Sequence, residues 1–540
     1  MRTFFLFALL SFTLHSQAQQ FDLSTLSNSD PDTFNLPWPP YVFEHWVWED
    51  ESTQESALTI VDDYISRGIP VSAIIIDSPW ETGYNTFEWD TALFADAQAM
   101  IDSLHSRDVK VLLWITGIIN TDVQPMYDYA KDQGYFMKQT QFDNNPGVVD
   151  WWKGEGSLID WFNPDAVTWW KGLMDNMLDM GIDGWKCDGT DFSVLTSPYS
   201  PGDGGYHFNR TDYSHAYYQI HFDYTREVLG DDRVIHARPV DNYGSETGTD
   251  IGGAQAAFSP VETSFAAWVG DQDGTFEGMV WALNSMYHSY DMGYFSFGSD
   301  IGGYRDDDNY PTLGRSKELF IRWAQLGTFC GLMENGGGGE HRPWMFDQET
   351  EDIYTDLVEK RYQLVPYLMD NSGEYFDNQL SLMQFFNKDD YSYMLGPDIF
   401  VAPFLEEGTN ITVNFPAGNE WIYHYNSNQV YIGGTTETLT VPYTEYPVFI
   451  KGASTSVNEL TEAQVAVYPN PADDQLNIKL LESGLANPLV ELFDMTGKLV
   501  HSESFNVSVI SIDISNLPEG VYQCRITVDG KTANRKVVKQ

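Results

Sequence analysis

The sequence predicts an α/β protein, with a (β/α)8 TIM barrel followed by a small antiparallel β-sandwich domain and a C-terminal immunoglobulin-like β module. From about residue 41 to 335, short apolar runs alternate with amphipathic stretches of helical period, which is typical of repeated strand–helix units. Alternating β segments follow, and a polar linker precedes a last β-rich stretch. We expect the barrel at 19–375, the β-sandwich at 376–453, the linker at 454–464 and the module at 465–540.

The first eighteen residues have the features of a cleavable signal peptide. Arg2 supplies a basic start, a short apolar run follows, and Ser16 and Ala18 form a small-x-small cleavage site. The run is too short to span a membrane, and no later stretch is long and apolar enough to do so. We therefore expect an exported protein without a membrane span.

The barrel prediction depends on eight apolar runs, each a candidate strand. The stretches between them read as helices in several places; one of these begins at Pro164 and stops at Gly181. Eight strand–helix repeats predict a TIM barrel. The runs are residues 41–49, 72–77, 109–116, 183–188, 233–239, 264–271, 293–300 and 328–335.

In a TIM barrel the chemistry lies at the carboxyl ends of the strands, so the last residue of each run is a candidate site residue. Most of these ends are carboxylates, where apolar residues or turn formers would satisfy the fold alone. The eight end residues are Glu49, Asp77, Thr116, Asp188, Arg238, Asp271, Asp300 and Glu334.

The composition excludes several classes of function. With 29 Lys and Arg against 79 Asp and Glu, the formal net charge of −50 repels nucleic acid and anionic membranes. Only three cysteines are present, scattered and odd in number, which excludes a disulfide scaffold and disfavours a zinc cluster. No His-x-x-x-His or Asp-x-Asp-x-Asp loop supplies metal ligands, so we expect no metal and no cofactor.

Carboxylates, an arginine and a lysine at a barrel mouth, with tryptophans near the strand ends, suit a sugar ligand. Aromatic faces stack on pyranose rings, and charged groups bond to hydroxyls. Hydrolysis of a sugar bond needs two carboxyl groups, and a separation of about 5–5.5 Å predicts retention whereas about 6.5–9.5 Å predicts inversion. Asp188 and Asp271 end the fourth and sixth runs and could face each other over a ring.

Several motifs then carry a specific resemblance. The segment "GIDGWKCDGTD" resembles the nucleophile segment of glycoside hydrolase family 31, and "WVGDQDGTFEGM" resembles its acid/base segment. "LIDWFNPDAVTWW", "FGSDIGGY", "ELFIRWAQLGTF", "EKRYQLVPYL" and "YMLGPDIFVAPFL" resemble further markers of the family in the same order. The resemblance covers roughly residues 41–452 and implies a retaining α-glycosidase.

The resemblance also implies roles for individual residues. Asp188 would attack the anomeric carbon, and Asp271 would protonate the leaving oxygen and then deprotonate water. Asp191 would match an acidic residue that the family has three positions after the nucleophile. The remaining residues would bind the sugar before the cleaved bond or support its binding: Asp77, Trp114, Lys186, Arg238, Trp268 and Asp300, the last bracing Arg238 and Trp268.

Two departures from the family pattern concern substrate choice. The family follows strand eight with Phe-x-Pro-x-x-Arg-x-His, but Gly331, Glu334 and Gly336 stand at the proline, arginine and histidine. His341 or Glu334 could replace that histidine, which holds a sugar hydroxyl. The family's large N-terminal β-sandwich, which often contributes a loop to the pocket, has no counterpart before the first run.

The last stretch, with "VYPNPADDQLNIKL" and "LPEGVYQCRITVDGKTANRKVVKQ", resembles the sorting domain of type IX secretion in Bacteroidota. It implies export to the cell surface or the medium through that machinery; an immunoglobulin-like binding module is the alternative. Together these observations predict an exo-acting enzyme on an oligosaccharide or polysaccharide, most simply an α-glucosidase. An α-galactosidase, an α-xylosidase, a transglycosylase and a glycan-binding pseudo-enzyme remain as alternatives.

Overall fold

The computed structural model describes residues 19–190, 194–240, 259–305, 315–454, 458–459, 465–480, 488–494, 498–505, 507, 509–528 and 531–540. The predicted signal peptide and most of the predicted linker lie outside these residues. The chain falls into two compact units, one of residues 1–413, 423–429 and 438–450 and one of residues 414–422, 430–437 and 451–540. Among the described residues, no helix has the length and apolar character needed to cross a membrane.

The first unit is built on an eight-stranded parallel sheet in the order β12-β11-β10-β7-β3-β2-β1-β13. A parallel bridge between Asp300 and Glu334 joins the two outer strands and closes the sheet into a barrel. The fold class predicted from the sequence is therefore confirmed. The strands are β1 (His45–Glu49), β2 (Ala73–Ile76), β3 (Lys110–Ile115), β7 (Gly184–Cys187), β10 (His236–Ala237), β11 (Ala266–Trp268), β12 (Phe297–Gly298) and β13 (Met333–Asn335).

Every predicted run contains one strand, but the strands are shorter than the runs. Residues 40–43 form a 3-10 helix, η3 (Pro40–Phe43), because Pro40 fixes the backbone at its first position, so β1 begins only at His45. Thr328 belongs to a helix rather than to the eighth strand. Each apolar run corresponds to a buried segment of the chain, and this segment is longer than the hydrogen-bonded strand within it.

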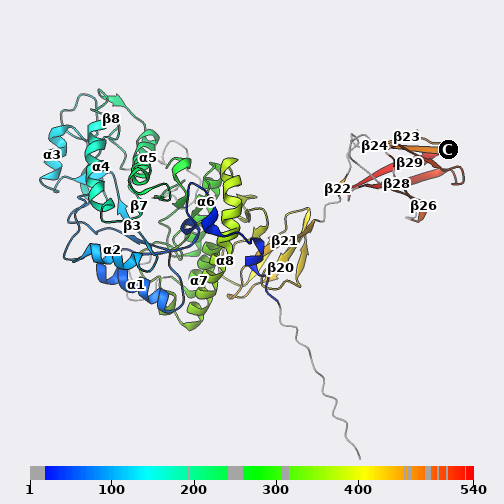
Figure 1. The fold of residues 1–540 in the computed structure, drawn as a ribbon, viewed down its shortest axis with the longest axis horizontal. Coiled ribbons are helices and arrows are strands. Elements are labelled where there is room, and N and C mark those ends of the chain that lie inside the picture. Colours follow the sequence, from blue (N-terminus) through cyan, green and yellow to red (C-terminus); the bar gives the residue numbers. More distant parts are fainter. Residues whose placement is uncertain are drawn as a thin grey trace, which may run out of the picture. The chain divides into compact units, whose positions relative to one another are not determined.

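Helices surround the strands (Figure 1). Most of them begin at residues suited to capping. Thr53 and Ser56 form a capping box at the start of α1, and Asn163 caps α4, which has Pro164 in its first turn. Gly181 follows α4 with a φ of 93°, a left-handed conformation that favours glycine. The helices are α1 (Gln54–Ser66), α2 (Ala97–His105), α3 (Met126–Gln133), α4 (Pro164–Leu178), α5 (Arg210–Leu229), α6 (Phe276–Asp291), α7 (Lys317–Thr328) and α8 (Gln348–Asp377).

Two small antiparallel sheets are inserted at the carboxyl side of the barrel strands. After β3 come β4 (Ile118–Asn120), β5 (Val148–Trp151) and β6 (Gly154–Leu158), in the order β4-β6-β5. After β7 come β8 (Tyr199–Ser200) and β9 (Tyr206–His207). The remaining short helices are η1 (Leu23–Leu26), η2 (Pro31–Thr33), η4 (Val261–Thr263) and η5 (Pro343–Met345).

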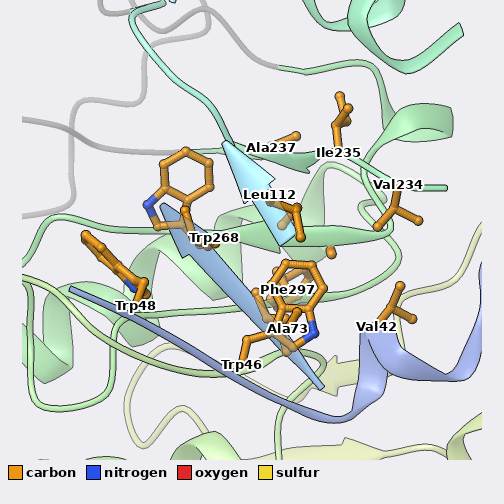
Figure 2. Close-up of a cluster of buried hydrophobic side chains, with 14 of the residues drawn as sticks. Val42, Trp46, Trp48, Ala73, Leu112, Val234, Ile235, Ala237, Trp268 and Phe297 are labelled. Carbon is orange, nitrogen blue, oxygen red and sulfur yellow. The ribbon is translucent and has the colours of Figure 1, made fainter. Parts of the chain in front are cut away.

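The barrel interior is filled by large side chains from successive strands. In Figure 2 Trp46, Ala73 and Phe297 lie together, and Trp268 and Trp48 lie to one side of them. All five are almost completely buried. This close packing makes the barrel a solid support for groups at the ends of its strands.

The segments after the barrel are antiparallel β structure. One sheet pairs β14 (Met383–Phe385), β15 (Tyr393–Leu395), β16 (Ile399–Val401) and β21 (Val448–Ser454) in this order. The other strands of this segment are β17 (Asn410–Asn414), β18 (Asn419–Tyr423), β19 (Val430–Ile432) and β20 (Thr436–Thr440).

The C-terminal module has a five-stranded sheet, β22-β29-β28-β25-β26, and a three-stranded sheet, β23-β24-β27. Alternate residues of both sheets, such as Leu476, Ile478, Val490 and Ile526, form one buried core. Its strands are β22 (Asn458–Glu459), β23 (Val465–Tyr468), β24 (Gln475–Leu480), β25 (Leu489–Phe493), β26 (Leu499–Ser504), β27 (Val509–Asp513), β28 (Gly520–Val528) and β29 (Lys531–Lys539).

Candidate active site

Strand β7 delivers two charged side chains to the carboxyl end of the barrel. Lys186 and Asp188 stand two residues apart, so they point to the same face, while the buried Cys187 points to the other. Lys186 and Asp188 both line one cavity of about 210 Å³. The charge at the end of this otherwise apolar strand therefore belongs to a cavity at the barrel mouth.

Arg238, which follows β10, connects the two predicted catalytic carboxylates. Its Nε donates to Asp188 Oδ1 at 3.0 Å, and its Nη2 donates to Asp271 Oδ1 at 3.0 Å. Its Nη1 donates to the Gly270 carbonyl oxygen at 2.6 Å, next to Asp271 in the chain. One guanidinium thus holds both carboxylates at the same cavity, and its fork geometry fixes their relative placement.

The surroundings of Asp188 favour its ionised form. Burial would raise the pKa of this carboxyl, but the charges of Arg238 and Lys186 oppose burial and hold the pKa below its usual value. Trp114 in β3 adds a hydrogen bond from its indole N–H to Asp188 Oδ2 at 3.2 Å. Asp188 is therefore a carboxylate with donors on both oxygens, placed at a cavity.

A second ion pair lines the same cavity. Lys186 Nζ donates to Asp77 Oδ2 at 2.8 Å, and Asp77 Oδ1 accepts the backbone N–H of Ser78 at 2.8 Å. The Lys186 ammonium also lies 3.4 Å from the ring centroid of Trp48. Burial alone would lower the pKa of Lys186, but the charge of Asp77 and its hydrogen bond to the ammonium raise it. This pair offers both donors and acceptors to hydroxyl groups.

The structure brings six of the nine predicted site residues to the cavity: Asp77, Trp114, Lys186, Asp188, Arg238 and Asp271. It adds six lining residues that the sequence reasoning did not assign: Trp48, Asp50, Ser78, Trp152, Lys153 and Tyr304. The signals for some of these were present in the sequence. Asp50 follows the first run by one residue, and Tyr304 ends the motif "FGSDIGGY". Trp152 and Lys153 lie between β5 and β6, an insertion that strand–helix counting does not locate.

Asp50 is an additional carboxylate at the cavity. Its Oδ2 accepts a hydrogen bond from the Tyr304 hydroxyl at 3.2 Å. Burial and the nearby charge of Asp77 raise the pKa of Asp50 to about 6. Glu49 ends β1, but Asp50 reaches the cavity, because successive residues point to opposite sides.

Trp268 and Asp300 lie behind the cavity wall. The Trp268 ring stacks on His236 with centroids 4.4 Å apart, and the Arg238 guanidinium carbon lies 4.4 Å from its centroid. Both side chains are fully buried and neither lines the cavity. The Asp300 oxygens and the Trp268 indole N–H have no hydrogen-bond partner among the described residues, so Asp300 makes no bracing hydrogen bond to Arg238 or Trp268.

His341 does not reach the cavity. Its Nδ1 lies 3.1 Å from the Ile301 carbonyl oxygen, and its Nε2 lies 3.1 Å from the Gly338 carbonyl oxygen. Burial and the charge of Arg315 lower the pKa of His341 well below its usual value. This imidazole is engaged by the glycine-rich loop rather than exposed to a ligand. Asp191 lies outside the described residues.

Within the described residues, no group of three or more His, Cys, Asp or Glu side chains is arranged to hold a metal ion. The cavity instead contains carboxylates paired with an arginine and a lysine. Groups of these types can take part in proton transfer, carboxylate attack and hydrogen bonding to a polar ligand.

Comparison with known proteins gives three matches to family models. Residues 37–371 match the TIM-barrel domain of glycosyl hydrolases family 31, and residues 375–455 match the C-terminal domain of that family. Residues 466–540 match the secretion system C-terminal sorting domain. The last match identifies the module as a type IX sorting domain, which directs the protein to the cell surface or the extracellular space.

Individual relatives are distant. An alpha-xylosidase of Emericella nidulans is 25% identical over 93% of this chain and 63% of its own length. An alpha-glucosidase 2 of Bacillus thermoamyloliquefaciens is 24% identical over 78% of this chain and 54% of its own. The crystal structure of an alpha-xylosidase from a soil metagenome, complexed with xylose, superposes with a TM-score of 0.64 at 22% identity over 77% of this chain and 64% of that one.

The chain therefore spans less than two thirds of the length of these relatives. The structural likeness supports the barrel fold. The barrel-domain match alone covers more than half of the 540 residues, in the region that carries the cavity. On this evidence the chain belongs to glycosyl hydrolase family 31.

Proposed function

We propose that this protein is a retaining, exo-acting α-glycoside hydrolase that removes terminal α-linked sugars. The observation that carries the proposal is the Arg238 guanidinium, which contacts Asp188 and Asp271 at one cavity. Two carboxyl groups flanking the scissile bond are what glycoside hydrolysis requires. The small volume of this cavity, about 210 Å³, supports action on a chain end rather than inside a continuous chain.

In this proposal Asp188 is the nucleophile and Asp271 is the acid/base. An Asp188 oxygen forms a bond to the anomeric carbon as the glycosidic bond breaks, and Asp271 gives its proton to the leaving oxygen. Water then attacks the anomeric carbon, its proton passes to Asp271, and the Asp188 carboxylate is released. Two successive inversions return the original α configuration.

The assignment of Asp188 is supported by its electrostatics. Arg238 and Lys186 keep its pKa low, so the attacking group is ionised before substrate arrives. The Trp114 indole and the Arg238 guanidinium hold its two oxygens in place. Preorganised donors of this kind lower the cost of reaching the transition state.

The other lining residues are proposed to hold the sugar hydroxyls. Asp77 and Lys186 form a paired acceptor and donor, and Trp114 presents an aromatic surface beside Asp188. Arg238 can hold a hydroxyl as well as the two carboxylates, since a guanidinium has five N–H donors. Trp268 and Asp300 do not contact the sugar in this proposal and act only through the residues that line the cavity. His341 makes no contact with the substrate.

For the sugar, an α-glucoside is the first candidate and an α-xyloside the second. The second is favoured by the Emericella nidulans relative, which is named an alpha-xylosidase. The cavity volume of about 210 Å³ also favours the α-xyloside, because it lies below the usual ligand-pocket range of about 300–1,000 Å³. Xylose is the smaller sugar, since it lacks the hydroxymethyl group of glucose.

The test is a panel of aryl α-glucoside, α-xyloside and α-galactoside with the purified protein, followed by NMR of the first-formed product. We expect one α-glycoside to be preferred by about 10–200-fold, the usual discrimination of one small group in a pocket, with an α-configured product. A β-configured first product contradicts retention. Sugar binding without turnover on any member would support the pseudo-enzyme instead. Competition of added sugars with water would identify a transglycosylase.

A further inference from the structure

A pair of buried carboxyl groups lies at the closure of the barrel, behind the cavity. Asp300 follows β12 and Glu334 belongs to β13, and the two residues form the bridge that closes the sheet. Both are completely buried, and none of their four carboxylate oxygens has a hydrogen-bond partner among the described residues. Ionised carboxylates are not buried without donors, because desolvation costs more than such a site can return.

The cations nearest to this pair are already engaged. Lys186 Nζ donates to Asp77, and Arg238 donates to Asp188 and Asp271. Burial raises the pKa of Glu334 to about 8, and the charges of Asp271 and Asp77 act in the same direction. The positive charges of Lys186 and Arg238 lower this pKa but do not outweigh burial. Burial and the neighbouring Glu334 likewise raise the pKa of Asp300.

His236 in β10 completes the surroundings of the pair. Its Nε2 lies 2.8 Å from Glu334 Oε2 but without the alignment of a hydrogen bond. Burial and the charges of Lys186 and Arg238 lower the pKa of His236 well below its usual value, so the imidazole is neutral. It therefore brings no positive charge that would ionise Glu334.

Glu334 also explains a departure in the sequence. It stands where the family motif has an arginine, which reverses the charge at this position beside Asp300. A neutral, protonated acid is the form of glutamate that this site accommodates next to a second carboxyl group.

We propose that Asp300 and Glu334 are a protonated positioning pair, which stays neutral so that Lys186 remains on Asp77 and Arg238 remains on the two catalytic carboxylates. This inference rests on the proposed glycosidase function. When the pair loses a proton at alkaline pH, the new anion competes for Lys186 and Arg238. Asp77, Asp188 and Asp271 then lose part of their support, and activity falls.

The test is Glu334→Gln in the full chain, because glutamine mimics the neutral acid and cannot ionise. We expect kcat/KM at pH 6.5 within about threefold of the parent, since a neutral acid is replaced by a neutral amide, and an alkaline limb of the pH–activity profile displaced upward by at least about one unit. Asp300→Asn is the second variant and should displace the limb in the same direction.

Thermal unfolding gives a readout that does not depend on turnover. Folding raises the pKa of Glu334, so the folded state keeps a proton that the unfolded state releases, and stability falls as pH rises from about 4.5 toward 8. Glu334→Gln removes this loss, so its Tm relative to the parent should be higher at pH 8.5 than at pH 5.

The matched control is Glu44→Gln. Burial raises the pKa of Glu44 to about 7, but this residue precedes β1 at the opposite end of the barrel. The Glu44→Gln variant should change the pH dependence of Tm, but the alkaline limb of its pH–activity profile should lie at the same pH as in the parent. An unmoved limb in Glu334→Gln, or a loss above about a hundredfold at pH 6.5 in a folded variant, overturns the inference. Absence of turnover in the parent overturns the proposed function instead.

Discussion

The two ends of strand β7 carry the same residue type in opposite settings. Asp183 precedes the strand and Asp188 follows it, and the pKa of each carboxyl is held below its usual value. Asp183 accepts the backbone N–H of Val111 at 2.9 Å and lies 2.8 Å from His105 Nε2. Lys110 and Arg233 lie 3.3 and 3.4 Å away.

The two carboxylates differ in whether another molecule can reach them. Asp183 is surrounded by its own ion-pair network and lines none of the described cavities, so its charge is used within the fold. Asp188 has firmly held donors, yet it lines a cavity where another molecule can reach it. A lowered carboxyl pKa therefore does not identify a catalyst by itself; the accessible cavity is what distinguishes the proposed nucleophile from the structural anion.

The largest effect that separates the two ends is on turnover. Asp188→Asn removes the attacking carboxylate, so we expect kcat to fall by at least about 10⁴-fold. Asp183→Asn should leave kcat within about threefold, because Asp183 does not reach the cavity. Initial rates on the best aryl α-glycoside check both variants. Near-normal turnover in folded Asp188→Asn would refute the assignment of the nucleophile.

Asp271 should have the next largest effect, and its size should depend on the leaving group. Asp271→Ala removes the proton donor, so hydrolysis of a disaccharide should fall by about 10²–10⁴-fold. The glycosyl fluoride of the same sugar needs no proton on its leaving group, so formation of the glycosyl-enzyme from it should fall far less. Pre-steady-state rates on the two substrates measure the difference. An equal loss on both would mean that Asp271 acts only by holding Arg238.

At the other end of the strand the expected effect is on stability. Asp183→Asn should lower the free energy of unfolding by about 2 kcal/mol near pH 7, because the carboxylate is buried while its cationic partners remain partly exposed. The folded-state pKa of Asp183 is depressed, so its contribution is present above the ordinary carboxyl pKa of 3.8 and is lost as pH falls below it. Urea unfolding at pH 7 and pH 3 should show the difference between variant and parent shrinking at the lower pH.

The sequence predicts the barrel well because its signals are local. Each strand is a short apolar run, and most of the helices begin at a capping residue, as at Thr53 and Asn163. The strand ends then supply Asp77, Asp188, Arg238 and Asp271 as candidates, since parallel strands bring their carboxyl ends together. All four line the cavity.

What the sequence does not supply is the direction and depth of individual side chains. Trp268 and Asp300 sit at strand ends like the others, but packing turns them behind the cavity wall. Trp152 and Lys153 reach the cavity from an insertion whose place depends on contacts distant in the chain. The pairing of Arg238 with Asp188 and Asp271 likewise depends on segments that follow three different strands, β10, β7 and β11.

The smallest predicted effect concerns the rim of the open end. Trp152 lines the cavity with 46% of its surface exposed, at the turn between β5 and β6, and its neighbour Trp151 lies parallel to Trp114 with centroids 6.4 Å apart. An exposed indole there can pack on the sugar that leaves. Trp152→Ala should therefore lower kcat/KM for a disaccharide by about five- to tenfold.

The glycosyl fluoride of the same sugar isolates this contact, because a fluoride is too small to reach Trp152, so its kcat/KM should be unchanged. Tyr129 on α3 is a matched control, since it is 49% exposed and does not line the cavity. Tyr129→Ala should leave both substrates unaffected. A loss in Trp152→Ala that is equal for the two substrates would place the indole against the sugar that is retained rather than the one that leaves. The open end of the barrel would then bind a single sugar, and the proposed action at chain ends would rest on that sugar alone.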